Sequence, residues 1–439
     1  MYAVYRTDNN ACSIHYINAR FTNYVSHFSL LFADASLLSI PQFYADSKQI
    51  FPFSQFDRWA NRAYNSVMTK THEDDQMFKE PEDFIVEELP LYEPSGAGTH
   101  TYFAIRKRNL STLEAINRIA QELQASTRDF GYAGLKDKNA VTTQILSVEG
   151  IAPEQVLRIE QPDIEVLWAE RHTHKLRVGH LRGNRFELIL HDMPHDTLPL
   201  IKAMMAQLVT EGVPNRFGTQ RFGNKNDSHL IGKALVKAEW ETVLHYLLTE
   251  DALQVDSVAR RMQQELARKP VEKVITSIPH RLRKLYLSAY QAHLFNSILE
   301  KRMPHLGKLL TGDIAVKHSN GAPFLVKDPT TEQPRADALE ISPSGPIFGY
   351  KMRMPTGEVL DLETAILADE SVRLEKFRKV VGIRLPGTRR PLRMPIQLHE
   401  VSAVDSGIGI RLRFTLPAGG YATVVVEELL GNIQPSKSV

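Results

Sequence analysis

Strand-like segments lie on both sides of a long helical stretch in this chain of 439 residues. Alternating and β-branched patterns run from about residue 84 to 190, helical patterns dominate after about residue 240, and β-rich runs return at 407–431. A helical stretch inserted into a single sheet explains this order better than three domains joined end to end. We therefore predict an α+β fold with a mixed, mainly antiparallel sheet that is interrupted by an inserted domain.

The domain bounds follow from these changes of pattern. Residues 1–75 are rich in Tyr, Phe, Asn and Ser without clear periodicity, and we interpret them as an extension of unknown role. The sheet domain is predicted to occupy 76–240, the inserted domain 241–375, and the return to the sheet domain 376–439. A length of 439 residues is consistent with two or three such units.

Several local elements are predicted from caps and periodicity. Ser111 and Glu114 form a capping box ahead of a helix whose predicted apolar face carries Leu113, Ile116, Ala120 and Leu123. A helix at 199–212 is expected to end at Gly212. The run at 281–303 predicts a helix with one apolar face, formed by Leu287, Tyr290, Leu294 and Ile298.

Four further predictions concern connections and the C-terminal part. Two strands are expected around a turn at 180–184, and a charged helix at 366–379. The motif "GTRRP" at 387–391 is predicted to form a turn. The two β-rich runs around 417–420 predict a hairpin.

The composition excludes several classes of protein. Hydrophobic residues make up 43% and charged residues 24%, which is ordinary for a soluble globular chain with a net charge of +2. Cys12 is the single cysteine, so no internal disulfide or cysteine-based zinc site can form, and a reducing cytoplasm is expected. The run at 27–43 contains Asp34 and Pro41 and is too short and polar to span a membrane, and no secretory signal is recognised.

The segment "GYAGLKDKNAVTTQ" at 131–144 holds one carboxylate, Asp137, between Lys136 and Lys138. Two neighbouring cations favour the ionised form of a carboxylate if they are also close in space. An ionised carboxylate on a tight turn suits nucleophilic or electrostatic work at an electron-poor carbon. The alternative is an aspartate that only caps a turn, which glycine-rich loops often contain.

The segment "VPNRFGTQRFGNKNDSHLIGKAL" at 213–235 interleaves amides, aromatic rings and cations. An extruded nucleobase needs a ring face, hydrogen bonds to its edge and contacts to its phosphates. Asn215, Phe217, Arg216 and Arg221 could supply them, although the phenylalanines could equally belong to the core.

Clusters of cations at 171–185 and 373–393 suggest a face that binds a polyanion. The residues that we select for RNA contact are Arg182, Arg216, Arg221, Arg389 and Arg390. An ordinary solvated helix face explains the cations at 373–379 equally well. His172, His174 and His180 lack a matching set of carboxylates or cysteines, so we predict no metal site.

Taken together, these motifs resemble the TruD family of tRNA pseudouridine synthases. The resemblance rests on "EDFIVEE", "GLKDKNAVTTQ", "HKLRVGHLRGNRFELIL", "VPNRFGTQRFG", "LSAYQAHLFNSIL", "GPIFGYKM" and "LPAGGYATVVVEEL", which follow in family order over about 78–430. It implies a pseudouridine-synthase-type catalytic domain interrupted by an inserted α/β TRUD domain.

The resemblance also implies roles for individual residues. Asp137 matches the family's essential aspartate, Asn215 and Phe217 its uridine-pocket residues, and Phe84 the phenylalanine of the first motif. Lys79 lies about one residue away from the register of a pocket lysine. At position 216 this chain has Arg where the family usually has Tyr.

The implied activity is the isomerisation of a uridine, uridine 13 of tRNA, to pseudouridine by Asp137 on a flipped-out nucleotide that stacks on Phe217. It needs no cofactor, and we expect a monomer whose partner is tRNA. A non-catalytic RNA-binding protein or chaperone of the same fold is the alternative, as is a synthase that acts on another RNA.

Overall fold

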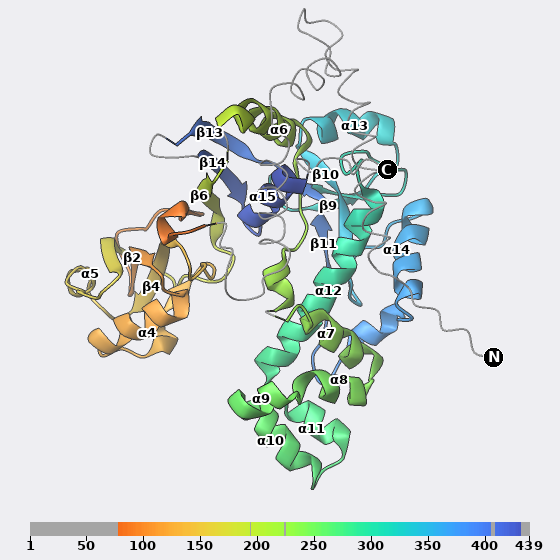
Figure 1. Cartoon of the computed structure of the whole chain (residues 1–439), viewed down its shortest axis with the longest axis horizontal. Helices are drawn as coiled ribbons and strands as arrows, with labels where there is room; N and C mark the ends of the chain where they lie inside the picture. Colours follow the sequence, from red (N-terminus) through yellow and green to blue (C-terminus); the bar gives the residue numbers. More distant parts are fainter. Residues whose placement is uncertain (1–77, 194, 224, 405–408, 432–439) are drawn as a thin grey trace, which may run out of the picture.

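The structure is a computed structural model that describes residues 78–193, 195–223, 225–404 and 409–431 (Figure 1). The predicted extension at 1–75, with Cys12, lies outside the described residues.

The described residues form an 8-stranded sheet in the order β13-β14-β6-β1-β4-β2-β5, with β3 paired to β4. The pair β1–β4 is parallel and the other pairs are antiparallel. The predicted fold class, α+β with a mixed and mainly antiparallel sheet, is therefore confirmed. The strands are β1 Phe84–Pro90, β2 His100–Arg108, β3 Gly131–Tyr132, β4 Val141–Glu149, β5 Ile164–His172, β6 Leu181–His191, β13 Gln397–Ala403 and β14 Gly409–Pro417.

The C-terminal part returns to one edge of this sheet, where β13 is the outermost strand and β14 lies next to it. Strand β14 pairs with β6 from Gly409 opposite His191 to Pro417 opposite Gly183. The predicted hairpin is wrong, because the run after Pro417 forms helix α15 (Ala422–Gly431), and β14 takes β13 as its second partner. A short apolar run does not distinguish a buried strand from a buried helix by periodicity.

Two groups of helices cover the sheet. Helices α4 (Thr112–Glu122) and α5 (Pro153–Val156) pack with β2, β4 and β5, and α6 (Leu198–Glu211) and α15 pack with β6 and β14 (Figure 1). The capping box of Ser111 and Glu114 and the end of α6 at Gly212 are both confirmed. The prediction that Leu113 lies on the buried face of α4 is wrong, since this residue is 36% exposed. The buried face contains Ala115 and Ile119 instead.

The predicted turn at 180–184 is also corrected, because β5 ends at His172 and β6 begins at Leu181, so the connection spans residues 173–180.

A second module is built around the long helix α12 (His280–Arg302), whose four predicted core residues are all buried. Its other helices are α7 Ser228–Lys237, α8 Trp240–Leu247, α9 Glu250–Val255, α10 Ser257–Leu266, α11 Val271–Ser277, α13 Pro329–Asp337 and α14 Glu358–Asp369. Its strands, in the order β11-β10-β8-β9, are β8 Ile314–Lys317, β9 Pro323–Leu325, β10 Ile341–Ile347 and β11 Thr388–Pro391.

Two predictions in this module are wrong. The charged helix expected at 366–379 is the end of α14 followed by a separate 3-10 turn at Leu374–Arg378. The motif "GTRRP" is not a turn, because its Thr388–Pro391 portion is strand β11 and pairs with β10.

The chain enters and leaves this module at adjacent positions. Strand β7 (Val213–Pro214) pairs with β12 (Arg393–Met394), and both contribute to the core of the sheet domain through Val213 and Met394. One core cluster of the module extends from Ile231 to Leu392. The sequence-based bounds of 241 and 375 lie inside that cluster and remain a prediction.

Candidate functional site

The loop that carries Asp137 lies where strands β1 and β4 separate. Strand β1 pairs with β4 at Val141–Thr143, whereas β3 pairs with β4 at Leu146 and Ser147. The loop at 133–140 connects β3 to β4, and Asp137 is exposed on it. The carboxylate of Asp137 is therefore at the surface, on a loop that is anchored at both ends by strands of the sheet.

The two lysines beside Asp137 are directed at other carboxylates. Lys136 Nζ pairs with Glu88 Oε2 at 2.7 Å in the interior, and Lys138 Nζ pairs with Glu114 Oε1 at 3.0 Å. The expectation that these lysines also support the charge of Asp137 stays a prediction. Their contacts tie the loop to β1 on one side and to α4 on the other.

Lys107 of β2 supplies the cation that lies under the loop. Its side chain is fully buried, and Nζ donates to the backbone carbonyl of Asp137 at 3.1 Å and to that of Leu110. Burial lowers the pKa of Lys107 from 10.5 to about 8, although the negative charge of Asp137 acts in the opposite direction. The sequence analysis missed Lys107, and its signal was the alternation along β2, which places Lys107 on the same face as the apolar Phe103 and Ile105.

The predicted uridine-pocket residues come together where the chain enters the second module. Arg390 Nη2 donates to Asn215 Oδ1, and Asn215 Nδ2 donates to the carbonyl of Pro391 at 2.9 Å. The guanidinium of Arg390 lies over the ring of Phe217, 4.2 Å from its centroid. Asn215 is buried and Phe217 is half-buried, so the pair forms a supported aromatic platform.

Asn296 of α12 holds this platform by its backbone. Its Oδ1 accepts from Phe217 N, and its Nδ2 donates to Phe217 O, both at 2.9 Å. The ring of Phe217 also packs edge-on against Phe295 at 5.6 Å. Asn296 was not among the predicted residues, although it directly follows Leu294 and Phe295 of the buried part of α12.

A short series of contacts connects the two groups. Lys136 Nζ donates to Asn184 Oδ1 at 2.6 Å, and Asn184 of β6 lies opposite Leu416 of β14. Just beyond the end of β14, the carbonyl of Gly419 accepts from Arg390 Nη2 at 3.1 Å. The Asp137 loop and the Phe217 platform therefore lie at the same end of the β6–β14 pair.

Phe84 and Lys79 take positions that differ from the expectation. Phe84 is buried in the core of the sheet domain, stacked on Phe78 and Phe186 with ring centroids 5.1 and 6.3 Å apart. Lys79 Nζ pairs with Asp192 at 3.0 Å, with both side chains more than half exposed. Phe84 therefore supports the core near Ala140, while Lys79 belongs to an exposed ion pair.

The five predicted RNA-contacting arginines fall into different environments. The prediction for Arg389 is wrong: its side chain is 1% exposed, and its guanidinium donates two hydrogen bonds to Glu363, so it does not reach an RNA surface. Arg390 belongs to the platform, and Arg216 pairs with Glu428 at 3.3 Å. Arg221 lies 5.7 Å from the Phe217 ring, and its buried Nε has no hydrogen-bond partner among the described residues. Arg182 is exposed.

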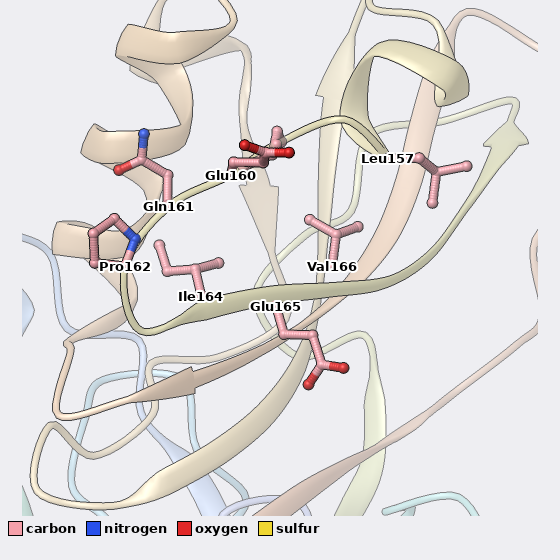
Figure 2. A pocket seen from close by; sticks show the side chains of 8 residues that line it. Leu157, Glu160, Gln161, Pro162, Ile164, Glu165 and Val166 are labelled. Carbon is pink, nitrogen blue, oxygen red and sulfur yellow. The ribbon is translucent and has the colours of Figure 1, made fainter.

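One hollow of the surface lies away from these residues. Figure 2 shows an open hollow that is formed by the segment after α5 and by the start of β5. It contains none of the predicted residues and is lined by Leu157, Ile159, Glu160, Gln161, Pro162, Ile164, Glu165 and Val166. Within the described ranges, no group of three or more His, Cys, Asp or Glu residues could hold a metal ion. None of the helices described is long and apolar enough to cross a membrane.

Comparisons with known proteins match this arrangement. The profile of the family described as tRNA pseudouridine synthase D (TruD) matches residues 68–270 and 254–429. The chain belongs to the TruD family. The tRNA pseudouridine synthase D of Geotalea daltonii is 43% identical over 383 residues, covering 81% of this chain and 96% of that protein. That of Syntrophotalea carbinolica is 42% identical over 377 residues, covering 80% and 94%.

A crystal structure of a TruD-family protein from Methanosarcina mazei, titled as a putative tRNA pseudouridine synthase D, superimposes with a TM-score of 0.67 at 26% identity. The match covers 80% of this chain and 92% of that one. The predicted family and the enzyme class, an isomerase, are confirmed by these findings.

Proposed function

We propose that this chain converts a uridine of tRNA, uridine 13, to pseudouridine, with Asp137 as the catalytic carboxylate. The observation that carries the proposal is the placement of Asp137. It is exposed on a loop whose backbone is held from below by Lys107 and whose neighbour Lys136 is tied to Glu88. A reacting group needs this combination of access and fixed position.

The chemistry is an isomerisation that needs no cofactor. The C1′–N1 bond of uridine breaks, the uracil turns while it is held, and C5 bonds to C1′; N1 ends with a proton and C5 loses one. Asp137 either attacks C1′ or removes the 2′ proton to give a glycal, and both routes begin with an ionised carboxylate. The target leaves its stack, as a base inside a folded RNA must do to be reached.

Phe217 is the proposed stacking partner of the free uracil. Asn296 holds its backbone and Phe295 supports its edge, so the ring presents a fixed surface. Arg390 now lies over the ring, and we infer that the uracil displaces its guanidinium to the edge of the base. There the N–H groups of Arg390 can donate to the uracil oxygens.

The decisive test is Asp137→Asn. We expect a folded protein that binds tRNA as before but forms no detectable pseudouridine, because the amide is neither nucleophile nor base. Asp163→Asn, at an exposed turn that leads into β5, is the matched control and should keep full activity. Rates come from tritium release from tRNA labelled with 5-³H-uridine, together with a thermal melt and a binding curve. Residual turnover in a folded Asp137→Asn protein would contradict the catalytic role and favour the RNA-binding alternative, since both residues cap turns equally well.

The target itself is tested by mapping pseudouridine in total RNA from cells with and without the gene. Loss at uridine 13 of tRNA is expected, and loss at another RNA alone would redirect the substrate assignment. We also infer a cytoplasmic monomer, which cell fractionation and sedimentation velocity can check.

A further inference from the structure

Three exposed apolar side chains lie on the Asp137 loop and on two loops connected to it. They are Leu91, 45% exposed, Leu135, 59% exposed, and Val178, 74% exposed, and we refer to them as the apolar rim. Single exposed apolar residues are common on protein surfaces and need no explanation. These three differ because they lie on three connected loops, one of which carries the proposed catalytic carboxylate.

Hydrogen bonds connect the three loops. Gly179 N donates to Ala133 O at 2.8 Å, which joins the loop of Val178 to the loop of Leu135. Tyr92 OH and His180 Nδ1 share a hydrogen bond of 2.6 Å, and Arg182 Nε donates to Leu91 O at 3.4 Å. The apolar rim is thus one surface, although its members are far apart in sequence.

The supports of this surface are buried even though its tips are exposed. Leu176 is buried against Ala133, and its backbone N–H donates to Ser147 Oγ at 3.0 Å. Leu135 is separated from Asp137 by Lys136 alone, whose side chain is fixed by Glu88. Apolar side chains on a fixed support can enter a stack of bases and remain in place there.

The charges around the apolar rim suit a polyanion. Lys136 and Lys138 are paired with Glu88 and Glu114. The other cations of the loops at 91–99, 133–140 and 173–180 are Lys175 and Arg177, and the exposed Arg182 follows closely in the sequence. Arg177 is exposed beside Val178. Cations beside exposed apolar tips match an RNA strand, whose phosphates flank the stacked bases.

We propose that the apolar rim, chiefly Leu135 and Val178, inserts into the RNA beside the target nucleotide and occupies the space that the extruded base leaves. This inference rests on the proposed function of Asp137. The base that is left behind then stacks on the inserted side chains, which offsets the loss of its neighbour. Binding of the rest of the RNA depends on phosphate contacts and not on these side chains.

The first test compares Leu135→Ala/Val178→Ala with the wild type in single-turnover reactions on a tRNA substrate. We expect the double variant to be roughly 10- to 100-fold slower, since opening a stack costs a few kcal/mol, while its Kd stays within about threefold. Val255→Ala is the matched control, because Val255 of α9 is 81% exposed on the distant helical part (Figure 1), and it should behave as wild type. An unchanged rate in the double variant would overturn the proposal.

The second test separates insertion from support of the loop. The same RNA is prepared with an abasic nucleotide next to the target, so that the target has no stacking neighbour. Wild type and double variant should then react at rates within about threefold of each other, because no stack has to be opened. Equal slowing on both RNAs would mean that the side chains only position Asp137, and the insertion would be wrong.

A third measurement is independent of catalysis. A 2-aminopurine beside uridine 13 should brighten when wild type or Asp137→Asn binds, and should stay dim with the double variant. If wild type converts no RNA but brightens the 2-aminopurine, and the double variant does not, the proposed function is wrong and the insertion is supported. If wild type and double variant give the same fluorescence, the insertion is wrong. Sedimentation velocity should give one mass for all variants, and a lower mass for the double variant would mean that a second copy covers the apolar rim.

Discussion

Lys107 combines two properties at the scale of single residues. It is a fully buried ammonium, and it donates to the backbone carbonyl of Asp137. Its positive charge favours an anion on the loop above it, whereas its burial favours the neutral amine, which lowers its pKa to about 8. A small rise in pH therefore removes the charge that supports the proposed reaction.

We predict that the single-turnover rate falls as pH rises through about 8, while the protein stays folded. The stability effect has the opposite sign: between about 8 and 10.5 the unfolded chain holds this proton and the folded chain does not, so this group's contribution to stability rises with pH. Rates at pH 7 to 9.5 and thermal melts over the same range check both signs.

Lys138→Met is the control for this profile, because Lys138 is exposed and pairs with Glu114, and its loss should leave the pH dependence unchanged. Lys107→Met should be slow at every pH. A wild-type rate that stays constant from pH 7 to 9.5 would contradict the role of Lys107.

At the scale of elements, strand β11 shows how two adjacent arginines acquire different tasks. Alternation along a strand sends successive side chains to opposite faces. Arg389 thus points into the module, where it binds Glu363, and Arg390 points to the Phe217 platform. The sequence analysis placed both on an RNA surface, because "GTRRP" was interpreted as a turn, in which neither side chain has to be buried.

We predict that Arg389→Ala lowers the free energy of unfolding by about 3–5 kcal/mol, because it leaves the carboxylate of Glu363 buried without its partner. The dependence of RNA affinity on salt should not change. Urea denaturation and binding curves at several salt concentrations check this. If the slope of log affinity against log salt concentration fell by about one and stability did not change, Arg389 would instead contact RNA.

The elements show what a single sequence can predict. Strong local signals, such as the capping box at Ser111, the glycine after α6 and the apolar face of α12, were interpreted correctly. Helix α15 was missed because its β-branched run favours a strand locally, and packing against the sheet overrides that preference. Asn296 and Lys107 were missed because their partners are backbone atoms that only the fold brings near. Asp137, Asn215 and Phe217 were selected by resemblance, and their roles stay predictions.

At the scale of the whole molecule, the proposed site spans the junction of two modules. Asp137 belongs to the sheet domain, while Phe217 is held by Asn296 of the long helix α12. The β7–β12 pair is the junction where the chain passes into the second module and back. The relative position of the two modules therefore determines the distance between the carboxylate and the stacking ring.

The last prediction concerns where the second module begins and ends. Helix α7 crosses α12 so closely that a methyl group at Gly232 would overlap the backbone carbonyl of Tyr286, and Ile231 and Leu235 share one buried cluster with Leu287. A fragment of residues 241–375 lacks α7 and exposes that face of α12, whereas a fragment of 213–394 keeps it covered and retains the β7–β12 pair.

We therefore expect a cooperative thermal transition from the 213–394 fragment and none from the 241–375 fragment, measured by circular dichroism, because uncovered apolar surface loses about 25 cal/mol per Å² of stabilisation. Gly232→Ala in the longer fragment tests whether the packing of α7 on α12 is the cause. It should lower the melting temperature sharply, since neither helix backbone can move without separating the two helices. A cooperative transition in the shorter fragment, at a temperature no lower than that of the longer one, would instead establish 241 and 375 as the bounds of the inserted unit.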